Sequence, residues 1–459
     1  MIKRPRETQP TAREIGEAGD PERSVLASEL AVYNAGLAAA TPLLAGYLGW
    51  RVLHGKSREG WRERWGNLPP EMRLQTRPGL WVHAASVGEV GVARPILAAL
   101  RESRPDLEAV MTVITPGGYE VAQSLVGKLV RHVAYLPFDL LPLVRRAVEW
   151  IRPDLFVGIE TEIWPNLLDS LRRSGVRAVL VNARISDRSF PRYRKARWLM
   201  RWALRQYDRV LAQSEEDARR FAVLGAEADR LATLGNVKFD EAEEPLPESA
   251  VLDLRRELGI RDGEQVWVIG STRSLAEEQL VWQAYRALLQ RLPGVVLIHA
   301  PRHVERADAV ESGLRQMGFT TARRSSVKGD RGDAQVIILD TFGELGRIYA
   351  VGDVAFIGNS LTPPGGGQNL LQPLAQGKPV LFGPYMNNFR DAVDLAAAAG
   401  VGIRVDGPEK LAAEVCRLLQ DREARQRIAS DALDLVRRHR GTARRYAEVL
   451  LAALPPGEP

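Results

Sequence analysis

One carboxylate, Glu89, lies where a parallel α/β sheet places a catalytic base. An apolar run ends near residue 84, and Glu89 falls in the first turn of the helix expected after it. Ligands of open α/β sheets sit at the carboxyl ends of strands. A carboxylate there can take a proton from an attacking hydroxyl, and the helix dipole helps to keep it ionised. Ser86-x-x-Glu89 also fits a capping box, so spacing alone leaves both interpretations open.

Two further segments place charged side chains at the ends of predicted elements. Glu160 and Glu162 follow the apolar run 155–159 and could assist the base, although a solvated loop is the alternative. Lys238, within 235–240, could stabilise a developing anion such as a departing phosphate. A surface lysine is the simpler interpretation of Lys238 alone.

The segment 356–391 has the order strand, Gly-rich loop, helix and strand. Its loop contains Pro363, Pro364 and three glycines at 365–367, and helical spacing follows over 369–376. A Gly-rich loop that opens a helix offers backbone N–H groups to an anion, and glycines allow close approach of a ligand. The segment is therefore predicted to cradle a nucleotide donor.

Other strand ends in the second half of the chain should point at the same crevice. The runs 270–273, 300–303 and 340–345 each follow a predicted strand with polar residues. Arg302 is suited to bind a phosphate in a bidentate manner. Several polar strand ends at one edge indicate a ligand site more specifically than any one of them alone.

Composition limits the class of protein. The chain has 459 residues, 45% of them hydrophobic and 26% charged, which is typical of a globular protein with more than one domain. The single cysteine, Cys416, excludes a disulfide framework and a cysteine-based zinc cluster. A net charge of +6 favours an anionic partner, and without an RNA-binding or zinc-finger signature nucleic acid is not expected.

Short apolar runs alternate with helical spacing twice along the chain, on either side of an acidic, proline-bearing segment. This pattern predicts an α/β protein of two doubly wound, Rossmann-like parallel-sheet domains facing a cleft, the GT-B architecture. The predicted domains are 54–240, for the acceptor, and 251–459, for the nucleotide sugar, with a linker at 241–250. The predicted strands are 80–84, 109–114, 133–136, 155–159, 178–181, 209–212, 266–270, 295–300, 336–339, 354–357, 380–382 and 401–405.

The beginning of the chain is predicted to contact a membrane. Residues 1–29 are polar and expected to be disordered, whereas 30–53 forms a hydrophobic anchor in which 31–50 carries no charge and basic residues follow. A buried or interfacial helix is the alternative. Within 184–209, arginines at 194, 197, 201 and 205 are predicted on one helical face beside Trp198 and Trp202. That face suits anionic headgroups or acceptor phosphates, or it is a solvated face above core tryptophans.

From about Val32 onward, the chain resembles the 3-deoxy-D-manno-octulosonate (Kdo) transferases of lipopolysaccharide synthesis. The number and order of the shared motifs make this resemblance specific. They are HAASVGEV, ITPGGYEVA, YLPFDL, ETEIWPNLL, NARIS, GNVKFD, GSTRS, APRHVER, DTFGELGRIY and GGGQNLLQPLAQGKPVLFGPYMNNFRD.

The resemblance implies transfer of Kdo from CMP-Kdo to a lipid A precursor, with inversion and without a metal or other cofactor, at the cytoplasmic face of the inner membrane. By position, Glu89 matches the family's proton acceptor, and Glu160 and Lys238 match residues that stabilise the transition state. The positions that match the CMP-binding segments are Pro301, Arg302, Gly343, Glu344, Leu345, Asn369, Leu370, Leu371 and Gln372.

Three residues depart from the family pattern. Gln368 and Arg273 stand where the family usually has histidine, and Gln372 stands where it usually has glutamate. The amide of Gln372 can still bond to ribose hydroxyls but carries no charge. The alternatives are therefore a related transferase with a different nucleotide sugar or acceptor, or a non-catalytic relative that binds lipid A.

Overall fold

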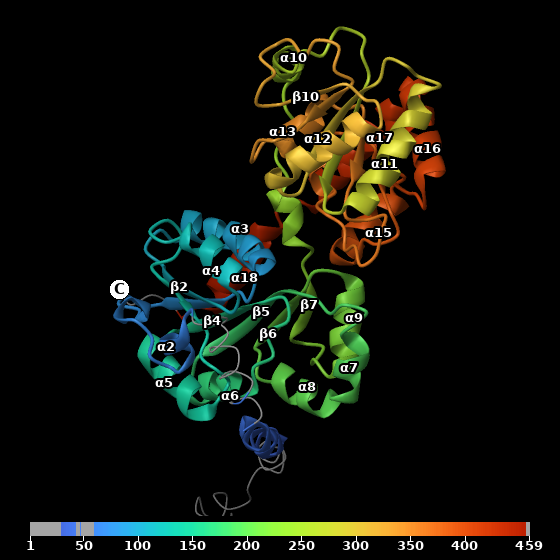
Figure 1. Cartoon of the computed structure of the whole chain (residues 1–459). Coiled ribbons are helices and arrows are strands. Elements are labelled where there is room, and N and C mark those ends of the chain that lie inside the picture. Colours follow the sequence, from blue (N-terminus) through green and yellow to red (C-terminus); the bar gives the residue numbers. More distant parts are fainter. Residues whose placement is uncertain (1–28, 43–45, 47–58, 456–459) are drawn as a thin grey trace, which may run out of the picture. The chain divides into compact units, whose positions relative to one another are not determined.

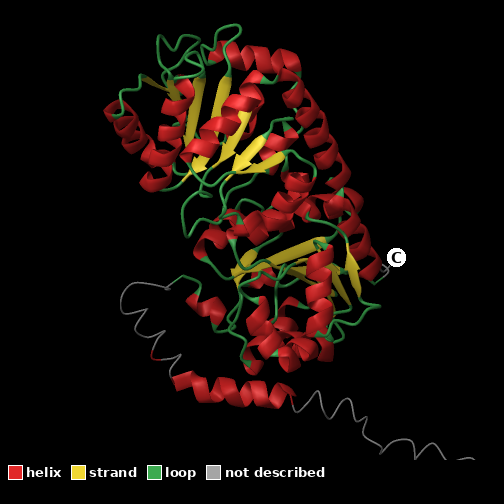
Figure 2. Ribbon diagram, turned by 90° about the vertical axis from the view of Figure 1, so that its right-hand side faces the viewer, coloured by secondary structure: helices red, strands yellow, loops and turns green. Residues whose placement is uncertain are grey.

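The computed structural model describes residues 29–42, 46 and 59–455. The chain divides into two compact units. Unit 1 comprises Met1–Asn236 with Ala443–Pro459, and unit 2 comprises Val237–Thr442. Within each unit, helices cover both faces of a seven-stranded parallel sheet (Figures 1 and 2). The predicted α/β class with two parallel-sheet domains is therefore confirmed.

The sheet of unit 1 has the order β3-β2-β1-β4-β5-β6-β7, and all its neighbouring strands are parallel. β1, β3 and β4 are buried along their whole length, as expected for apolar strands covered on both faces. The strands are β1 (Gly79–His83), β2 (Glu108–Val113), β3 (Val133–Tyr135), β4 (Leu155–Ile159), β5 (Arg177–Ala183), β6 (Arg209–Ala212) and β7 (Leu231–Thr233).

Helices α3 to α9 connect successive strands of unit 1, because parallel neighbours need a crossover connection. α3 follows β1 and α6 follows β4, so both begin at the carboxyl edge of the sheet. The helices are α2 (Trp61–Arg64), α3 (Val87–Ser103), α4 (Pro116–Gln123), α5 (Leu141–Ile151), α6 (Pro165–Arg173), α7 (Phe190–Lys195), α8 (Arg197–Leu204), α9 (Glu215–Leu224) and α18 (Thr442–Ala453), with the 3-10 turn η1 (Pro70–Met72).

The end of the chain differs from the predicted domain 251–459, because the segment Ala443–Pro459 belongs to unit 1. Tyr446 of α18 is fully buried, and its hydroxyl donates to the carbonyl oxygen of Gly235 at 3.0 Å. The predicted linker 241–250 also packs on unit 2, where the amide N–H of Leu246 donates to the side chain of Gln376 at 2.9 Å. A helical pattern in sequence does not reveal which sheet a terminal helix covers.

Unit 2 repeats the architecture with the strand order β10-β11-β9-β8-β12-β13-β14. Its strands are β8 (Val266–Thr272), β9 (Val296–Pro301), β10 (Thr321–Arg323), β11 (Val336–Ile338), β12 (Val354–Ile357), β13 (Val380–Phe382) and β14 (Gly402–Arg404). Its helices are α10 (Glu248–Glu257), α11 (Leu275–Leu289), α12 (Ala307–Gln316), α13 (Leu345–Val351), α14 (Leu371–Ala375), α15 (Arg390–Ala398), α16 (Pro408–Gln420) and α17 (Arg422–His439), with 3-10 turns η2 (Val237–Glu241), η3 (Val304–Arg306) and η4 (Asn387–Phe389).

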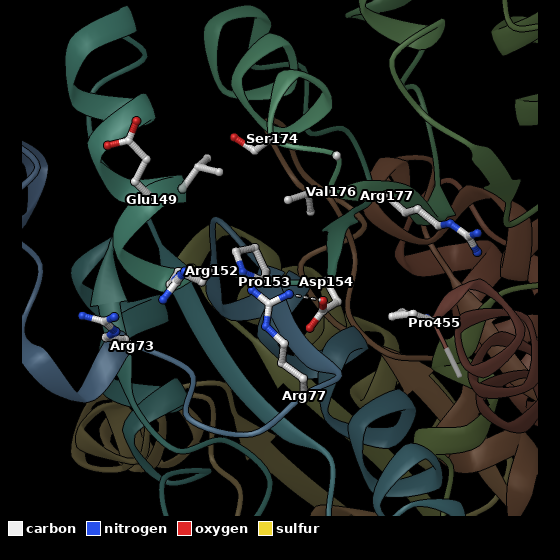
Figure 3. Close-up of a pocket in the computed structure, with 12 residues that line it drawn as sticks. Arg73, Arg77, Glu149, Arg152, Pro153, Asp154, Ser174, Val176, Arg177 and Pro455 are labelled. Carbon is white, nitrogen blue, oxygen red and sulfur yellow. Dashed lines mark hydrogen bonds and ion pairs between the residues drawn. The ribbon is translucent and has the colours of Figure 1, made fainter. Parts of the chain in front are cut away.

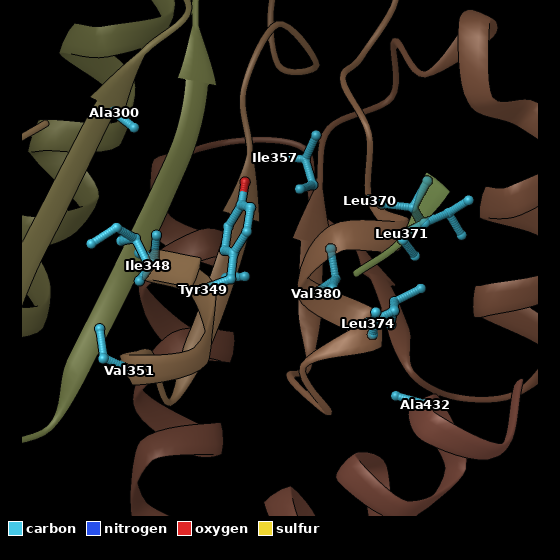
Figure 4. Close-up of a cluster of buried hydrophobic side chains, with 14 of the residues drawn as sticks. Ala300, Ile348, Tyr349, Val351, Ile357, Leu370, Leu371, Leu374, Val380 and Ala432 are labelled. Carbon is cyan, nitrogen blue, oxygen red and sulfur yellow. The ribbon is translucent and has the colours of Figure 1, made fainter. Parts of the chain in front are cut away.

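One core of unit 2 packs α13 and α14 against the sheet. Tyr349 of α13, Leu371 and Leu374 of α14, and Val380 of β13 are all at most 2% exposed and belong to the same cluster (Figure 4). Burying side chains of this size contributes about 1.5–3 kcal/mol each. The elements that begin at the carboxyl edge of the sheet are thus fixed by packing beneath it.

The N-terminal helix over residues 29–42 packs on unit 1. The Tyr33 hydroxyl donates to Asp139 Oδ2 at 2.9 Å, and the side-chain amides of Asn34 and Asn166 exchange hydrogen bonds at 2.8 and 2.9 Å. Within the described ranges, no helix has the length and apolar character needed to cross a membrane. The predicted anchor 30–53 is not confirmed, since much of it, like nearly all of 1–29, lies outside the described residues.

Candidate functional site

Glu89 takes part in the capping of a helix, and its carboxyl group also has a raised pKa. It lies in the first turn of α3, where its Oε2 accepts a hydrogen bond from the Ser86 amide N–H at 3.2 Å, within a complete capping box. Burial and, after it, the nearby charges of Glu162 and Glu160 raise its pKa from 4.5 to about 7, while His83 acts in the opposite direction. The capping interpretation is therefore correct, and the carboxylate is also poised to exchange a proton near neutral pH.

Glu160 lies at the same sheet edge because β1 and β4 are neighbours, with His83 paired to Gly158 in the register. Its backbone is left-handed, with φ 66°, which is uncommon for a non-glycine residue. Its Oε2 lies 3.6 Å from an Arg184 guanidinium nitrogen. The structure thus brings the predicted residues Glu89 and Glu160 to one edge of unit 1.

A buried histidine beside these carboxylates was not predicted as a site residue. His83 is fully buried, and its Nε2 lies 2.9 Å from Glu162 Oε2, although the two are misaligned for a hydrogen bond. Its Nδ1 lies 3.0 Å from both the carbonyl and the hydroxyl oxygen of Thr112. Glu162 Oε2 also accepts from the Trp164 indole N–H. The only sequence signal was a polar residue inside an apolar strand.

The third predicted catalytic residue, Lys238, belongs to unit 2 and not to the first domain that it was expected to close. It lies in η2, and its Nζ is 5.1 Å from the ring centroid of Phe389. Such a contact orients an ammonium group without neutralising it. Glu89 and Glu160 thus form one group in unit 1, whereas Lys238 belongs to unit 2.

The residues of unit 2 that were predicted to bind the donor lie at or follow the carboxyl ends of β11, β9 and β12, and Arg273 follows that of β8; these strands are neighbours in the order β11, β9, β8 and β12. Pro301 ends β9 in a buried position, and Arg302 follows it, exposed. The Arg302 amide N–H donates to the Thr272 carbonyl at 2.8 Å, which ties the β9 loop to the β8 loop. Arg273, on the β8 loop, is exposed as well. Two exposed guanidinium groups on adjacent strand ends suit a phosphate.

The loop after β11 is held by the side chain of Glu344. Its Oε1 accepts from an Arg324 guanidinium nitrogen at 3.2 Å, and its Oε2 accepts from the Thr341 hydroxyl. Gly343 has φ 85°, a conformation that favours glycine. Leu345 then starts α13. Glu344 therefore orders this predicted donor segment by hydrogen bonding within the protein.

The need for glycine at 365–367 has a different physical cause from the predicted one. Gly365, Gly366 and Gly367 have φ values of 56°, 121° and 74°. A Cβ on Gly367 would lie 2.3 Å from Met386 Sδ, and one on Gly365 would lie 2.3 Å from Tyr385 Cβ. The glycines thus admit the protein's own 385–388 turn, and close approach of a ligand is not needed to explain them.

The helix after this loop is also shorter than predicted. It was expected over 369–376, whereas α14 spans only Leu371–Ala375. Asn369 precedes it, and its Oδ1 accepts from the Leu371 amide at 2.9 Å. Leu370 and Leu371 are buried in the core, and Gln372 is partly exposed. Asn369 and Gln372 therefore offer side chains at this edge, while Leu370 and Leu371 support it from below.

The basic segment 184–209 forms two helices and not one. α7 and α8 meet at Ala196, so the predicted single face of arginines is wrong. Trp198 is 41% exposed, whereas Trp202 is buried in the core. We call the exposed cations of this region together with Trp198 the α7–α8 surface. Its cations are Arg188, Arg192, Arg194, Lys195, Arg197 and Arg201.

A cavity of about 680 Å³ lies at the opposite, amino-terminal edge of the unit 1 sheet (Figure 3). Arg77, Arg152 and Arg177 line it, and Arg77 is paired with Asp154 at 2.9 Å. None of the predicted site residues lines this cavity. In the part of the chain that the structure describes, no group of three or more His, Cys, Asp or Glu side chains is arranged to hold a metal ion.

Comparison with known proteins identifies relatives that cover most of the chain. Residues 59–241 match the family model for 3-deoxy-D-manno-octulosonic-acid transferase. The 3-deoxy-D-manno-octulosonic acid transferase of Haemophilus influenzae is 33% identical over 91% of this chain and 97% of its own length. The Bordetella pertussis protein of the same name is 36% identical over 81% of this chain and 86% of its own.

Solved structures with low sequence identity share the fold. Anabaena HepE in complex with UDP aligns with a TM-score of 0.57 and 17% identity, over 82% of this chain and all of its own. The UDP-GlcNAc 2-epimerase of Neisseria meningitidis aligns with a TM-score of 0.54 and 11% identity, over 82% of this chain and 99% of its own. The fold of this chain thus also occurs in an epimerase. The chemistry must therefore be argued from the site residues.

Proposed function

Because the chain belongs to the 3-deoxy-D-manno-octulosonic acid transferase family and is a glycosyltransferase, we propose that it moves Kdo from CMP-Kdo to a lipid A precursor with inversion at the anomeric carbon. The single observation that supports the chemistry best is the environment of Glu89, a half-buried carboxylate at the carboxyl edge of the sheet whose pKa is raised to about 7. A base with a pKa near the working pH is the most effective proton acceptor.

In the proposed reaction, the Glu89 carboxylate takes the proton of a sugar hydroxyl on the acceptor. The hydroxyl oxygen attacks the anomeric carbon of Kdo, and the bond from that carbon to the phosphate oxygen of CMP breaks. The electron pair leaves with CMP, whose phosphate carries the resulting charge. Glu160 and Lys238 are proposed to stabilise the charge that develops. The step needs no metal or other cofactor.

Donor binding is proposed for the carboxyl edge of unit 2. Arg302 offers two parallel N–H groups to the phosphate, a geometry in which arginine excels. Gly343, Glu344 and Leu345 together with Asn369 and Gln372 line the same edge, and Pro301, Leu370 and Leu371 support it. The side-chain amides can hydrogen bond to the sugar hydroxyls of the nucleotide.

The protein is proposed to bind its acceptor at the cytoplasmic face of the inner membrane. The α7–α8 surface presents six exposed cations and the half-exposed indole of Trp198, the residue types that favour anionic lipid. The uncharged segment 31–50 and the basic residues after it support the same location.

A direct assay tests the proposal. Purified full-length protein is incubated with CMP-Kdo and a lipid A precursor, and the product mass is measured. Wild-type protein should add Kdo, whereas the Glu89→Ala variant should bind CMP but form no product. Turnover by Glu89→Ala would remove Glu89 as the base.

A second candidate is a related transferase with another nucleotide sugar, favoured by the uncharged Gln372 and the added cation of Arg273. Thermal-shift measurements with CMP, UDP and GDP separate the two. Stabilisation by CMP alone supports CMP-Kdo as the donor. Stabilisation by UDP or GDP would support the second candidate.

A further inference from the structure

Two adjacent glutamates at the start of α11 lie behind the proposed donor edge, and neither was predicted as a site residue. Glu277 and Glu278 are both fully buried. Buried carboxylates are costly unless hydrogen bonds satisfy them. Their partners lie in the loop after β12, at the last residue of β8 and in η3 after β9.

Glu277 holds the loop after β12. Its Oε2 accepts from the amide N–H of Asn359 at 2.6 Å, and its Oε1 accepts from those of Ser360 and Leu361 at 2.7 and 2.9 Å. Three backbone N–H groups on one carboxylate fix a loop in a single conformation. This loop leads directly into the glycines at 365–367, so Glu277 determines where that segment begins.

Glu278 holds the loops after β8 and β9. Its Oε1 accepts from the Thr272 hydroxyl at 3.1 Å, and its Oε2 accepts from an Arg306 guanidinium nitrogen at 2.5 Å. Thr272 ends β8 and precedes Arg273, and its carbonyl receives the Arg302 amide N–H. The backbones of both exposed arginines are therefore anchored near one buried carboxylate.

The direction of the hydrogen bonds around Thr272 follows from chemistry alone. The Trp282 indole can only donate, and it donates to His299 Nδ1 at 3.0 Å. His299 Nε2 must then carry the ring proton, which it donates to Thr272 Oγ1 at 2.9 Å. The Thr272 hydroxyl is left to donate to Glu278. Burial lowers the pKa of His299 to about 3, which keeps this ring neutral.

We propose that Glu277 and Glu278 are positioning residues for the donor, which fix from behind the three loops that would contact it. This inference rests on the proposed function, since it assumes that those loops bind the donor. Neither carboxylate is placed to touch the donor itself, because both are fully buried beneath the loops. Their contribution is preorganisation, which lowers the cost of ordering a site on binding.

The test compares Glu277→Gln with a matched control, Asp353→Asn. An amide at 277 would point N–H groups at the Asn359 amide, which displaces the loop. Asp353 also accepts from a backbone N–H, that of Val266 at 2.8 Å, but at the opposite edge of the same sheet. Binding of CMP is measured by calorimetry, and KM and kcat with CMP-Kdo are measured well below the unfolding temperature.

We expect Glu277→Gln to bind CMP at least tenfold more weakly and to raise KM for CMP-Kdo by a similar factor, with kcat changed less than threefold. Asp353→Asn should lower the unfolding temperature without changing CMP affinity. If wild type binds CMP and Glu277→Gln binds it equally tightly, the positioning role is overturned. If wild type itself does not bind CMP, the proposed function fails and this inference fails with it.

A milder pair of variants tests Glu278 without a buried charge change. Thr272→Val removes the hydroxyl that links His299 to Glu278, and Thr272→Ser keeps it. CMP affinity should fall several-fold in Thr272→Val and stay within twofold of wild type in Thr272→Ser. Equal affinity in the two variants would overturn the role of this link.

Discussion

Replacing Glu89 by glutamine should inactivate the enzyme and stabilise it in a pH-dependent way. The pKa of Glu89 is about 7 in the folded protein against 4.5 ordinarily, so folding favours its protonated form. Below pH 4.5 both folded and unfolded states hold the proton, and the site costs no stability. As the pH rises to 7 the unfolded state releases the proton first, and the folded state loses relative stability.

The magnitude follows from the two pKa values. At about 1.4 kcal/mol per pH unit, ionised Glu89 costs the folded protein about 3 kcal/mol above pH 7. A glutamine is neutral at every pH and keeps an oxygen for the Ser86 amide. Glu89→Gln should therefore raise the unfolding temperature at pH 8 by roughly 6–12 °C for a unit of this size. Its effect at pH 5 should be much smaller.

Thermal unfolding at pH 5 and pH 8 and transfer assays on the same preparations measure both effects. Transfer by Glu89→Gln should fall by about 10²–10⁴-fold, as for loss of a general base. The difference between Glu89→Ala and Glu89→Gln, which are both neutral, isolates the capping hydrogen bond, whose loss should cost about 1 kcal/mol at either pH. Glu215→Gln, which removes an exposed first-turn carboxylate from α9, should show no such pH-dependent gain. Equal unfolding temperatures for wild type and Glu89→Gln at pH 8 would refute the electrostatic reasoning.

Three further outcomes are expected. In wild type, kcat/KM should fall below about pH 7, where Glu89 takes up its proton. Glu162→Gln should shift this fall to lower pH, because it removes one of the charges that raise the pKa of Glu89. An unshifted profile would contradict the coupling between the two carboxylates. Arg302→Lys should bind CMP more weakly than wild type but more tightly than Arg302→Ala, measured by calorimetry, because a lysine keeps the charge but not the paired N–H groups. Trp198→Ala combined with Arg201→Ala should reduce sedimentation with anionic vesicles but not with neutral ones; equal loss on both would argue against an electrostatic contribution.

Sequence predicts the fold well where the chain is apolar and buried. The strand at Val354–Ile357 was predicted to the residue, because four consecutive apolar side chains lie between two covered faces. β7 and β10 were not predicted, since each is a three-residue edge strand whose residues are at least partly exposed. Edge strands lack the continuous apolar run by which central parallel strands are recognised.

From the sequence, only those site residues could be predicted whose place is shown by the residues next to them in the chain. Arg302 and Glu89 follow apolar runs directly, so their positions at strand ends could be inferred. Glu277 and Glu278 lie in an ordinary helix start, and their roles depend on backbone amides 82 to 84 residues away and on Arg306. Periodicity carries no information on such contacts, because they depend on which loops the sheet order brings together.

Glu89 shows why capping and catalysis are not competing explanations. The capping box fixes the carboxylate through the Ser86 amide and sets its direction at the start of α3. The same placement exposes it to the charges of Glu162 and Glu160, which make the folded state less stable at neutral pH. A residue needed only as a cap would be better served by glutamine, which caps without that cost. Retention of a carboxylate where an uncharged cap would be more stable is what a proton acceptor requires.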